Sequence, residues 1–146
     1  MNEETLKQII TRYENASFLV NRRLNVLLRE VVSTDLTVDQ VFMIRYIGAR
    51  NACTSSELSD AFCVGKSSIT AIITRLVDKG LIRRYPDEKD RRVTYLTLTE
   101  DGVRAVEQSV DGIQHMLTRY LTQFDEQEAE TFIATYEKLA KVLAEG

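Results

Sequence analysis

The sequence predicts a mainly α-helical protein with one small β-hairpin. Over most of the 146 residues, apolar side chains recur at spacings of three and four, the pattern of an amphipathic helix. Residues 81–85 and 93–98 instead alternate apolar and polar side chains, which is typical of strands buried on one face. The charged segment P-D-E-K-D lies between these two runs and supplies the turn of a hairpin.

Four helices are predicted before the hairpin, over residues 1–32, 37–49, 54–62 and 66–79. The first carries a heptad-type apolar stripe and is interrupted by Ser33-Thr34-Asp35. Capping-box sequences begin the second helix at Thr37 and the third at Thr54. The fourth ends at Gly80, a typical helix stop, and has a core face formed by Ile69, Ile72, Ile73 and Leu76.

Two more helices are predicted after the hairpin, one capped by Thr99 and one by Asp125. Together with the first helix, they carry more apolar surface than the small central domain could cover. Each large apolar side chain left in water forgoes roughly 1.5–3 kcal/mol. We therefore expect the ends of two chains to pack together as a homodimer; the alternative is that these helices fold back on their own domain.

The formal charge of −3 is unevenly distributed along the chain. Residues 63–95 hold eight Lys or Arg against four Asp or Glu, whereas residues 96–146 hold four against ten. Neutralisation of phosphate depends on the local face and not on the total charge. A helix followed by a basic hairpin is the arrangement of a winged helix-turn-helix, which touches DNA in two places, so the sequence indicates a DNA-binding protein.

Other classes of protein find little support in the composition. Two cysteines make no disulfide framework, and the start M-N-E-E-T-L-K-Q is unlike a signal peptide, so we expect a cytoplasmic protein without a membrane partner. No Gly-rich phosphate loop or nucleophile elbow is present, and we expect no enzyme activity. One histidine and two cysteines are too few for a metal centre, and no cofactor is expected.

The chain resembles the MarR family of bacterial transcriptional regulators along essentially its whole length. The most specific match is D-R-R-V-T-Y-L-T-L-T-E-D-G at 90–102, which has the family's wing pattern, and L-V-D-K-G-L-I-R-R at 76–84 matches its helix-to-strand junction. The resemblance implies one domain over 1–146, with dimerisation helices at 1–32 and 99–146 around a winged helix-turn-helix at 36–98. It also implies a homodimer that binds a pseudo-palindromic operator in double-stranded DNA, usually as a repressor.

The resemblance also implies which residues contact DNA. The family's major-groove surface falls on the recognition helix, at Lys66, Ser67, Ser68, Thr70, Ala71, Thr74 and Arg75. In the wing the candidates are Lys89, Asp90, Arg91 and Arg92, where the two arginines would enter the minor groove and Asp90 would hold an arginine. Ser55 and Ser56 are candidates for contact with the DNA backbone.

Within the family, a small molecule or an oxidant often relieves repression, and both routes stay open here. Tyr13, Arg22, Phe42 and Tyr46 are candidates for a pocket that binds a small-molecule effector. Cys53 and Cys63 are candidates for a redox-responsive repressor, although a lone cysteine is more often a small hydrophobe. A third alternative is a winged-helix protein–protein interaction module without DNA binding, which the basic wing tip disfavours.

Two positions depart from the family pattern. Cys63 stands in the turn before the recognition helix, where the family commonly has Gly. Gly65 stands where Ser or Thr commonly caps that helix. Gly is a tolerable N-cap, so neither departure threatens the fold.

Overall fold

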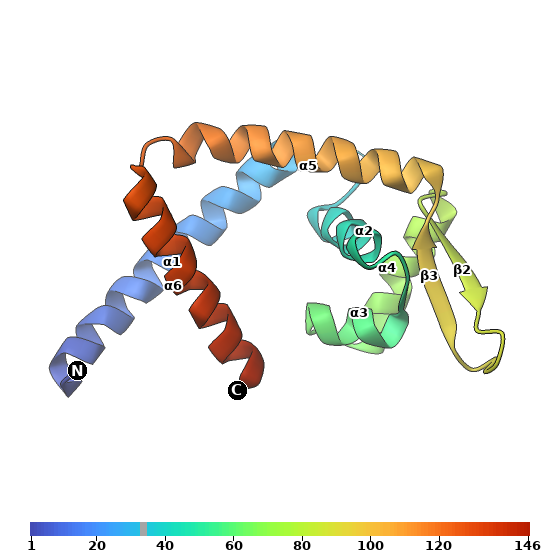
Figure 1. Ribbon diagram of the computed structural model, residues 1–146, viewed down its shortest axis with the longest axis horizontal. Coiled ribbons are helices and arrows are strands. Elements are labelled where there is room, and N and C mark those ends of the chain that lie inside the picture. Colours follow the sequence, from blue (N-terminus) through green and yellow to red (C-terminus); the bar gives the residue numbers. More distant parts are fainter. Residues whose placement is uncertain (33–34) are drawn as a thin grey trace. The chain divides into compact units, whose positions relative to one another are not determined.

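The computed structural model describes residues 1–32 and 35–146, which form two compact units, Met1–Gly112 and Ile113–Gly146. The described elements, labelled in Figure 1, are α1 (Glu3–Val31), α2 (Val38–Arg50), β1 (Cys53–Thr54), α3 (Ser55–Phe62), α4 (Lys66–Asp78), β2 (Ile82–Pro86), β3 (Thr94–Leu98), α5 (Glu100–Leu121) and α6 (Glu126–Glu145). The predicted mainly α-helical fold with a small hairpin is confirmed. The predicted interruption at Ser33 and Thr34 lies outside the described residues.

The three strands form one antiparallel sheet in the order β1-β3-β2. β2 and β3 are the predicted hairpin, with both ends of β2 and the start of β3 shifted by one residue. Arg84 lies opposite Leu96 in their register. Pro86 ends β2 on the edge of the sheet, where its missing N–H costs little. The sequence does not predict β1, because two residues are too few to show alternation.

The core lies where α2, α3 and α4 meet the sheet. Its fully buried side chains are Met43, Ile44, Ile47, Cys53, Leu58, Ile69, Leu76, Ile82 and Leu96. The predicted core face of α4 is confirmed, since Ile69, Ile73 and Leu76 are buried and Ile72 packs partly buried against them. The opposite face of α4 is thereby turned outward.

Local capping starts most helices where the sequence places them. At α2, Thr37 Oγ1 accepts a hydrogen bond from the Gln40 N–H and Gln40 Oε1 accepts one from the Thr37 N–H, both at 3.1 Å, so this capping box is confirmed. The box of Asp125 and Glu128 at α6 is confirmed as well. At α3 only half of the predicted box forms: Thr54 Oγ1 accepts a hydrogen bond from the Glu57 N–H at 3.2 Å. Among the described residues, the Glu57 side chain makes no hydrogen bond back to the Thr54 N–H. Thr54 is also the last residue of β1.

A tight junction joins α4 to the wing. Gly80 takes a positive φ of 72°, and the N–H groups of Gly80 and Leu81 donate to the carbonyls of Val77 and Leu76, as in a Schellman motif. The predicted stop at Gly80 is therefore confirmed. On the far side of the hairpin, the Thr99 N–H donates to the Leu81 carbonyl at 3.0 Å. A Cβ at Gly102 would collide with that same carbonyl, which explains the glycine in the wing motif.

The helices outside the core leave much apolar surface exposed. Neither α1 nor α6 contains a buried residue. Exposed large side chains include Leu6, Ile10 and Tyr13 of α1 and Phe132, Ile133 and Tyr136 of α6. This exposure is what the predicted homodimer would cover. None of the described helices has both the length and the apolar composition needed to cross a membrane.

Cys63 caps the C-terminus of α3 in the left-handed region, at φ 53° and ψ 40°. A side chain with a Cβ is strained there, and Gly is the residue that helix ends of this kind favour. The family's usual Gly at this position thus has a physical reason. The Cys63 thiol lies on the surface, 3.6 Å from the carbonyl oxygen of Asp60.

We expect the substitution Cys63→Gly to raise the free energy of unfolding by about 1 kcal/mol, because it removes the left-handed strain at the end of α3. Urea unfolding at one fixed protein concentration measures this change. Cys63→Ala is the matched control, since it removes the thiol but keeps the Cβ. Equal stability of the two variants would contradict the strain argument.

Candidate nucleic-acid interface

The outward face of α4 is the first part of the candidate interface. All seven residues predicted on the recognition helix are exposed, opposite the buried isoleucines and Leu76. Thr70 Oγ1 donates to the Lys66 carbonyl at 2.8 Å, which leaves its lone pairs available to an outside donor. The structure thus gathers small polar side chains and two cations, Lys66 and Arg75, on one helical surface.

The start of α4 carries backbone donors without a side-chain cap. Gly65 is the N-cap and supplies no side-chain hydrogen bond to the first turn. A Cβ built at Gly65 would meet nothing within 4 Å, so this end of the helix is open. Uncapped N–H groups at a helix N-terminus favour anions such as phosphate.

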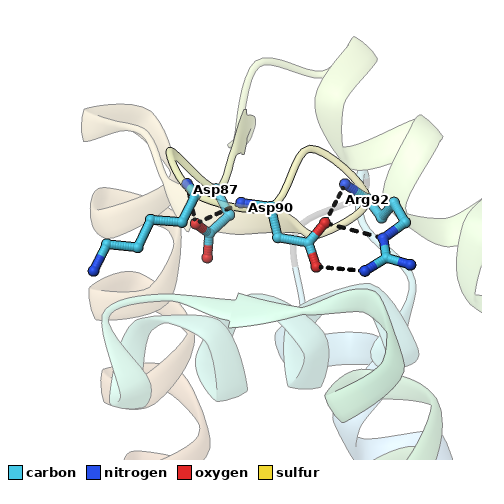
Figure 2. Close-up of polar contacts among 4 residues, drawn as sticks. Asp87, Asp90 and Arg92 are labelled. Atoms are coloured by element: carbon cyan, nitrogen blue, oxygen red, sulfur yellow. Dashed lines mark hydrogen bonds and ion pairs between the residues drawn. The ribbon is translucent and has the colours of Figure 1, made fainter.

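The wing turn is the second part and is held by Asp87 (Figure 2). Asp87 Oδ1 accepts hydrogen bonds from the backbone N–H groups of Lys89 at 2.7 Å and Asp90 at 3.3 Å. Its Oδ2 accepts the Tyr95 hydroxyl at 3.1 Å, and the Tyr95 ring stacks on Tyr85. One carboxylate therefore ties the turn to the strands beneath it.

Asp90 orients one of the two wing arginines. Figure 2 shows its carboxylate facing Arg92, whose backbone N–H and Nε donate to Oδ1 at 3.0 and 3.1 Å, while Nη2 donates to Oδ2 at 3.3 Å. The Arg92 side chain is still 90% exposed. Arg91 is exposed too and, within the described part of the chain, has no hydrogen bond or ion pair. The turn thus presents one oriented and one unrestrained guanidinium.

The same contacts shift acid–base equilibria in the wing. Hydrogen bonds from the Lys89 N–H, the Asp90 N–H and the Tyr95 hydroxyl lower the pKa of Asp87. The side chain and backbone N–H of Arg92 lower the pKa of Asp90. The hydrogen bond to Asp87 in turn raises the pKa of Tyr95. Both carboxylates are therefore ionised at neutral pH, in the form that holds the turn.

One arginine of β2, Arg84, belongs to this surface although the sequence assigns it no role. Arg83 and Arg84 are both exposed, and Arg84 Nη2 donates to Thr74 Oγ1 at 3.1 Å. Strand alternation is the signal that points to Arg84, because it shares a sheet face with Ile82, which packs in the core.

Ser55 and Ser56 are exposed at the start of α3, which leaves them open to the predicted contact with the DNA backbone.

The two cysteines have different environments. Cys53 is buried in the core, and burial, with a smaller effect of Glu57, raises the pKa of its thiol to about 11. Such a thiol stays protonated and is a poor nucleophile at neutral pH. Cys63 is exposed at the end of α3. Among the described residues, no three His, Cys, Asp or Glu side chains gather to hold a metal ion.

None of the four candidate effector-pocket residues lines a cavity found in the first unit. Tyr46 packs its ring edge-to-face against Phe62, with the Arg50 guanidinium 3.5 Å from the Tyr46 ring centre. Phe42 and Tyr13 are exposed, and Arg22 lies over the Phe18 ring. The cavity, of about 710 Å³, is lined by other residues, among them Val31, Leu36, Lys79 and Leu81.

We expect Asp87 and Asp90 to titrate below the ordinary Asp value of about 3.9. Folding lowers the pKa of both carboxyl groups. The turn contacts therefore stabilise the wing fully at pH values above the ordinary pKa of Asp, and this stabilisation is lost as pH falls through the lowered pKa. Carboxyl-carbon NMR shifts followed over pH measure both groups. Tyr95→Phe, which removes one donor, should raise the pKa of Asp87 and leave that of Asp90 unchanged; titration of Asp87 at or above 3.9 in the unsubstituted protein would contradict this.

Comparison with known proteins agrees with this geometry. A family model, the MarR family, matches residues 36–94. The multiple antibiotic resistance protein MarR of Escherichia coli (strain K12) is 30% identical over 106 residues, which cover 72% of this chain and 74% of that protein. The HTH-type transcriptional repressor MdtR of Bacillus subtilis (strain 168) is 30% identical over 102 residues, 70% of this chain and 66% of that protein.

Solved structures show the same winged helix. The crystal structure of a cysteine-to-serine mutant of MarR from E. coli, complexed with operator DNA, is similar with a TM-score of 0.78 at 26% identity. The match covers 89% of this chain and 94% of that one. The predicted family resemblance is confirmed: this chain belongs to the MarR family.

Proposed function

We propose that this protein is a DNA-binding transcriptional regulator, a homodimeric repressor that acts in the cytoplasm and catalyses no reaction. The observation that carries the proposal is the exposed polar face of α4 in the same compact unit as an arginine-bearing wing turn. Its relatives support it, since MdtR is named a repressor and the MarR mutant was solved with operator DNA.

In this proposal α4 enters the major groove. Ser67, Thr70 and their neighbours reach base edges through hydroxyl groups, and Lys66 and Arg75 reach guanine or phosphate. The open N-terminus of α4 after Gly65 adds backbone N–H donors for a phosphate. These donors and the side chains lie on one helix, so they approach the same stretch of duplex.

The wing turn enters the neighbouring minor groove. Arg92 is oriented by Asp90, which lowers the entropy lost when its guanidinium is inserted. Arg91 beside it adds a second cation without a competing carboxylate. Narrow A·T-rich minor grooves attract such side chains through their negative potential.

Pairing of two chains would set the spacing of the two half-sites. Entry into successive major grooves requires recognition helices about 34–36 Å apart. The exposed apolar side chains of α1 and α6 supply the surface for that pairing.

The proposal includes release of the protein from DNA by a small-molecule effector. Release by oxidation has less support, since Cys53 is buried and protonated.

Repeated binding selection from a random 30-base-pair duplex library tests the function. We expect one sequence to be enriched and to bind with a strong dependence on salt. Arg92→Ala should flatten the slope of log K against log salt by about one. Lys7→Ala, which removes one charge from the exposed face of α1, is the matched control and should leave the slope unchanged. A protein that enriches no sequence and binds no duplex at low salt would overturn the proposal.

Sedimentation at micromolar concentration tests the homodimer. We expect the mass of two chains for the unsubstituted protein. Ile10→Glu places a charge on the exposed apolar stripe of α1 and should shift the mass toward one chain. Thr11→Glu adds the same charge one residue away, off the stripe, and should stay a dimer. A monomeric unsubstituted protein would contradict the dimer.

A further inference from the structure

The sheet register directs Arg84 toward α4. Alternate residues of a strand share one face, so Arg84 points to the same side as Ile82, which is buried in the core that includes α4. Its partner across the hairpin, Leu96, is buried as well. Arg83 points to the opposite side. Of the two adjacent arginines, only Arg84 starts from the sheet face that packs on the recognition helix.

Arg84 is fixed to that helix by one hydrogen bond. Its Nη2 donates to Thr74 Oγ1 at 3.1 Å, and both side chains are exposed. Thr74 follows Lys66 and Thr70 at spacings of four, on the outward face of α4. The guanidinium therefore lies at the edge of the recognition surface, on the side of the wing.

This contact leaves most of the guanidinium available. An arginine has five N–H donors, and the hydrogen bond to Thr74 uses one of them. Within the described residues no carboxylate forms an ion pair with Arg84, whereas Arg92 is paired with Asp90. A planar cation with free donors and no protein counter-ion matches a phosphate group.

We propose that Arg84 binds a backbone phosphate of the DNA and that Thr74 is a positioning residue for it instead of a contact to a base. The inference rests on the proposed function. A strand of the DNA backbone separates the major groove from the minor groove. A side chain held between α4 and the wing meets that strand when α4 and the wing turn occupy the two grooves.

Fluorescence anisotropy with the duplex enriched by selection and a scrambled duplex of equal length tests the assignment. Arg84→Ala should weaken binding to both duplexes by the same factor, about tenfold, because a charged hydrogen bond to phosphate carries no sequence information. It should also lower the salt slope by about one. Arg83→Ala is the matched control, because it removes the same charge from the other face of β2 and should change the slope far less.

A double-mutant cycle tests the positioning role of Thr74. Thr74→Val removes the hydroxyl at nearly constant shape and should weaken binding in the unsubstituted protein, but not further in the Arg84→Ala background. Thr74→Ser keeps the hydroxyl and should restore affinity. Urea midpoints equal to that of the unsubstituted protein would show that these exposed substitutions leave the fold intact.

Two results would overturn the inference. The first is an Arg84→Ala variant that behaves like Arg83→Ala or loses affinity for the enriched duplex alone. The second is a Thr74→Val effect of equal size in both backgrounds, which would make Thr74 a direct contact. In both cases the unsubstituted protein binds DNA in the same assay. Failure of the inference is therefore distinct from failure of the proposed function, in which the unsubstituted protein would bind no duplex.

Discussion

Burial of one face of α4 sets the orientation of every group proposed to meet DNA. Ile69, Ile73 and Leu76 are almost completely removed from water, and each such side chain contributes roughly 1.5–3 kcal/mol. Rotating α4 about its axis by one residue, about 100°, would expose these side chains to water. It would also bury threonine hydroxyls in the core without hydrogen-bond partners. Both changes cost free energy, so the polar face has one allowed direction.

The junction after α4 passes that orientation on to the wing. Only Lys79, Gly80 and Leu81 separate the helix from β2, and the Schellman hydrogen bonds of Gly80 and Leu81 leave this segment little freedom. The Leu81 carbonyl then accepts the Thr99 N–H, so the second end of the hairpin is tied to the same point. Hydrogen bonds therefore connect α4 to both ends of the wing, and the contact of Arg84 with Thr74 adds a further link between the helix and β2.

The sequence predicts what short-range patterns determine. The hairpin, the core face of α4, the caps at Thr37 and Asp125 and the stop at Gly80 each depend on residues a few positions apart. β1 escapes prediction because its two residues acquire strand geometry only by pairing with β3. The bond between Arg84 and Thr74 escapes because it needs a helix, a turn and a strand to be placed together.

The predicted effector pocket is a case in which the sequence suggested a site that the fold does not form. Tyr46 and Phe42 suit a ligand pocket by residue type, yet Tyr46 is engaged by Phe62 and Arg50 once the chain folds. Residue type alone does not reveal which aromatic rings the core has already used. The cavity in the first unit is lined by aliphatic and polar side chains that carry no distinctive pattern in the sequence.

Arg84 and the two wing arginines, Arg91 and Arg92, differ in how firmly the protein holds them, and this difference bears on the proposed function. Arg92 is held by a carboxylate, Arg84 by a hydroxyl, and Arg91 by no described side chain. An ordered side chain loses less entropy on binding, but a carboxylate partner also competes with phosphate for the guanidinium. Among the described residues, Arg84 combines restraint with a charge that no carboxylate neutralises, whereas Arg91 has no restraining partner. In the proposed complex, Arg84 would therefore fix the register of the wing and helix on the duplex, while Arg91 would adjust to its local shape.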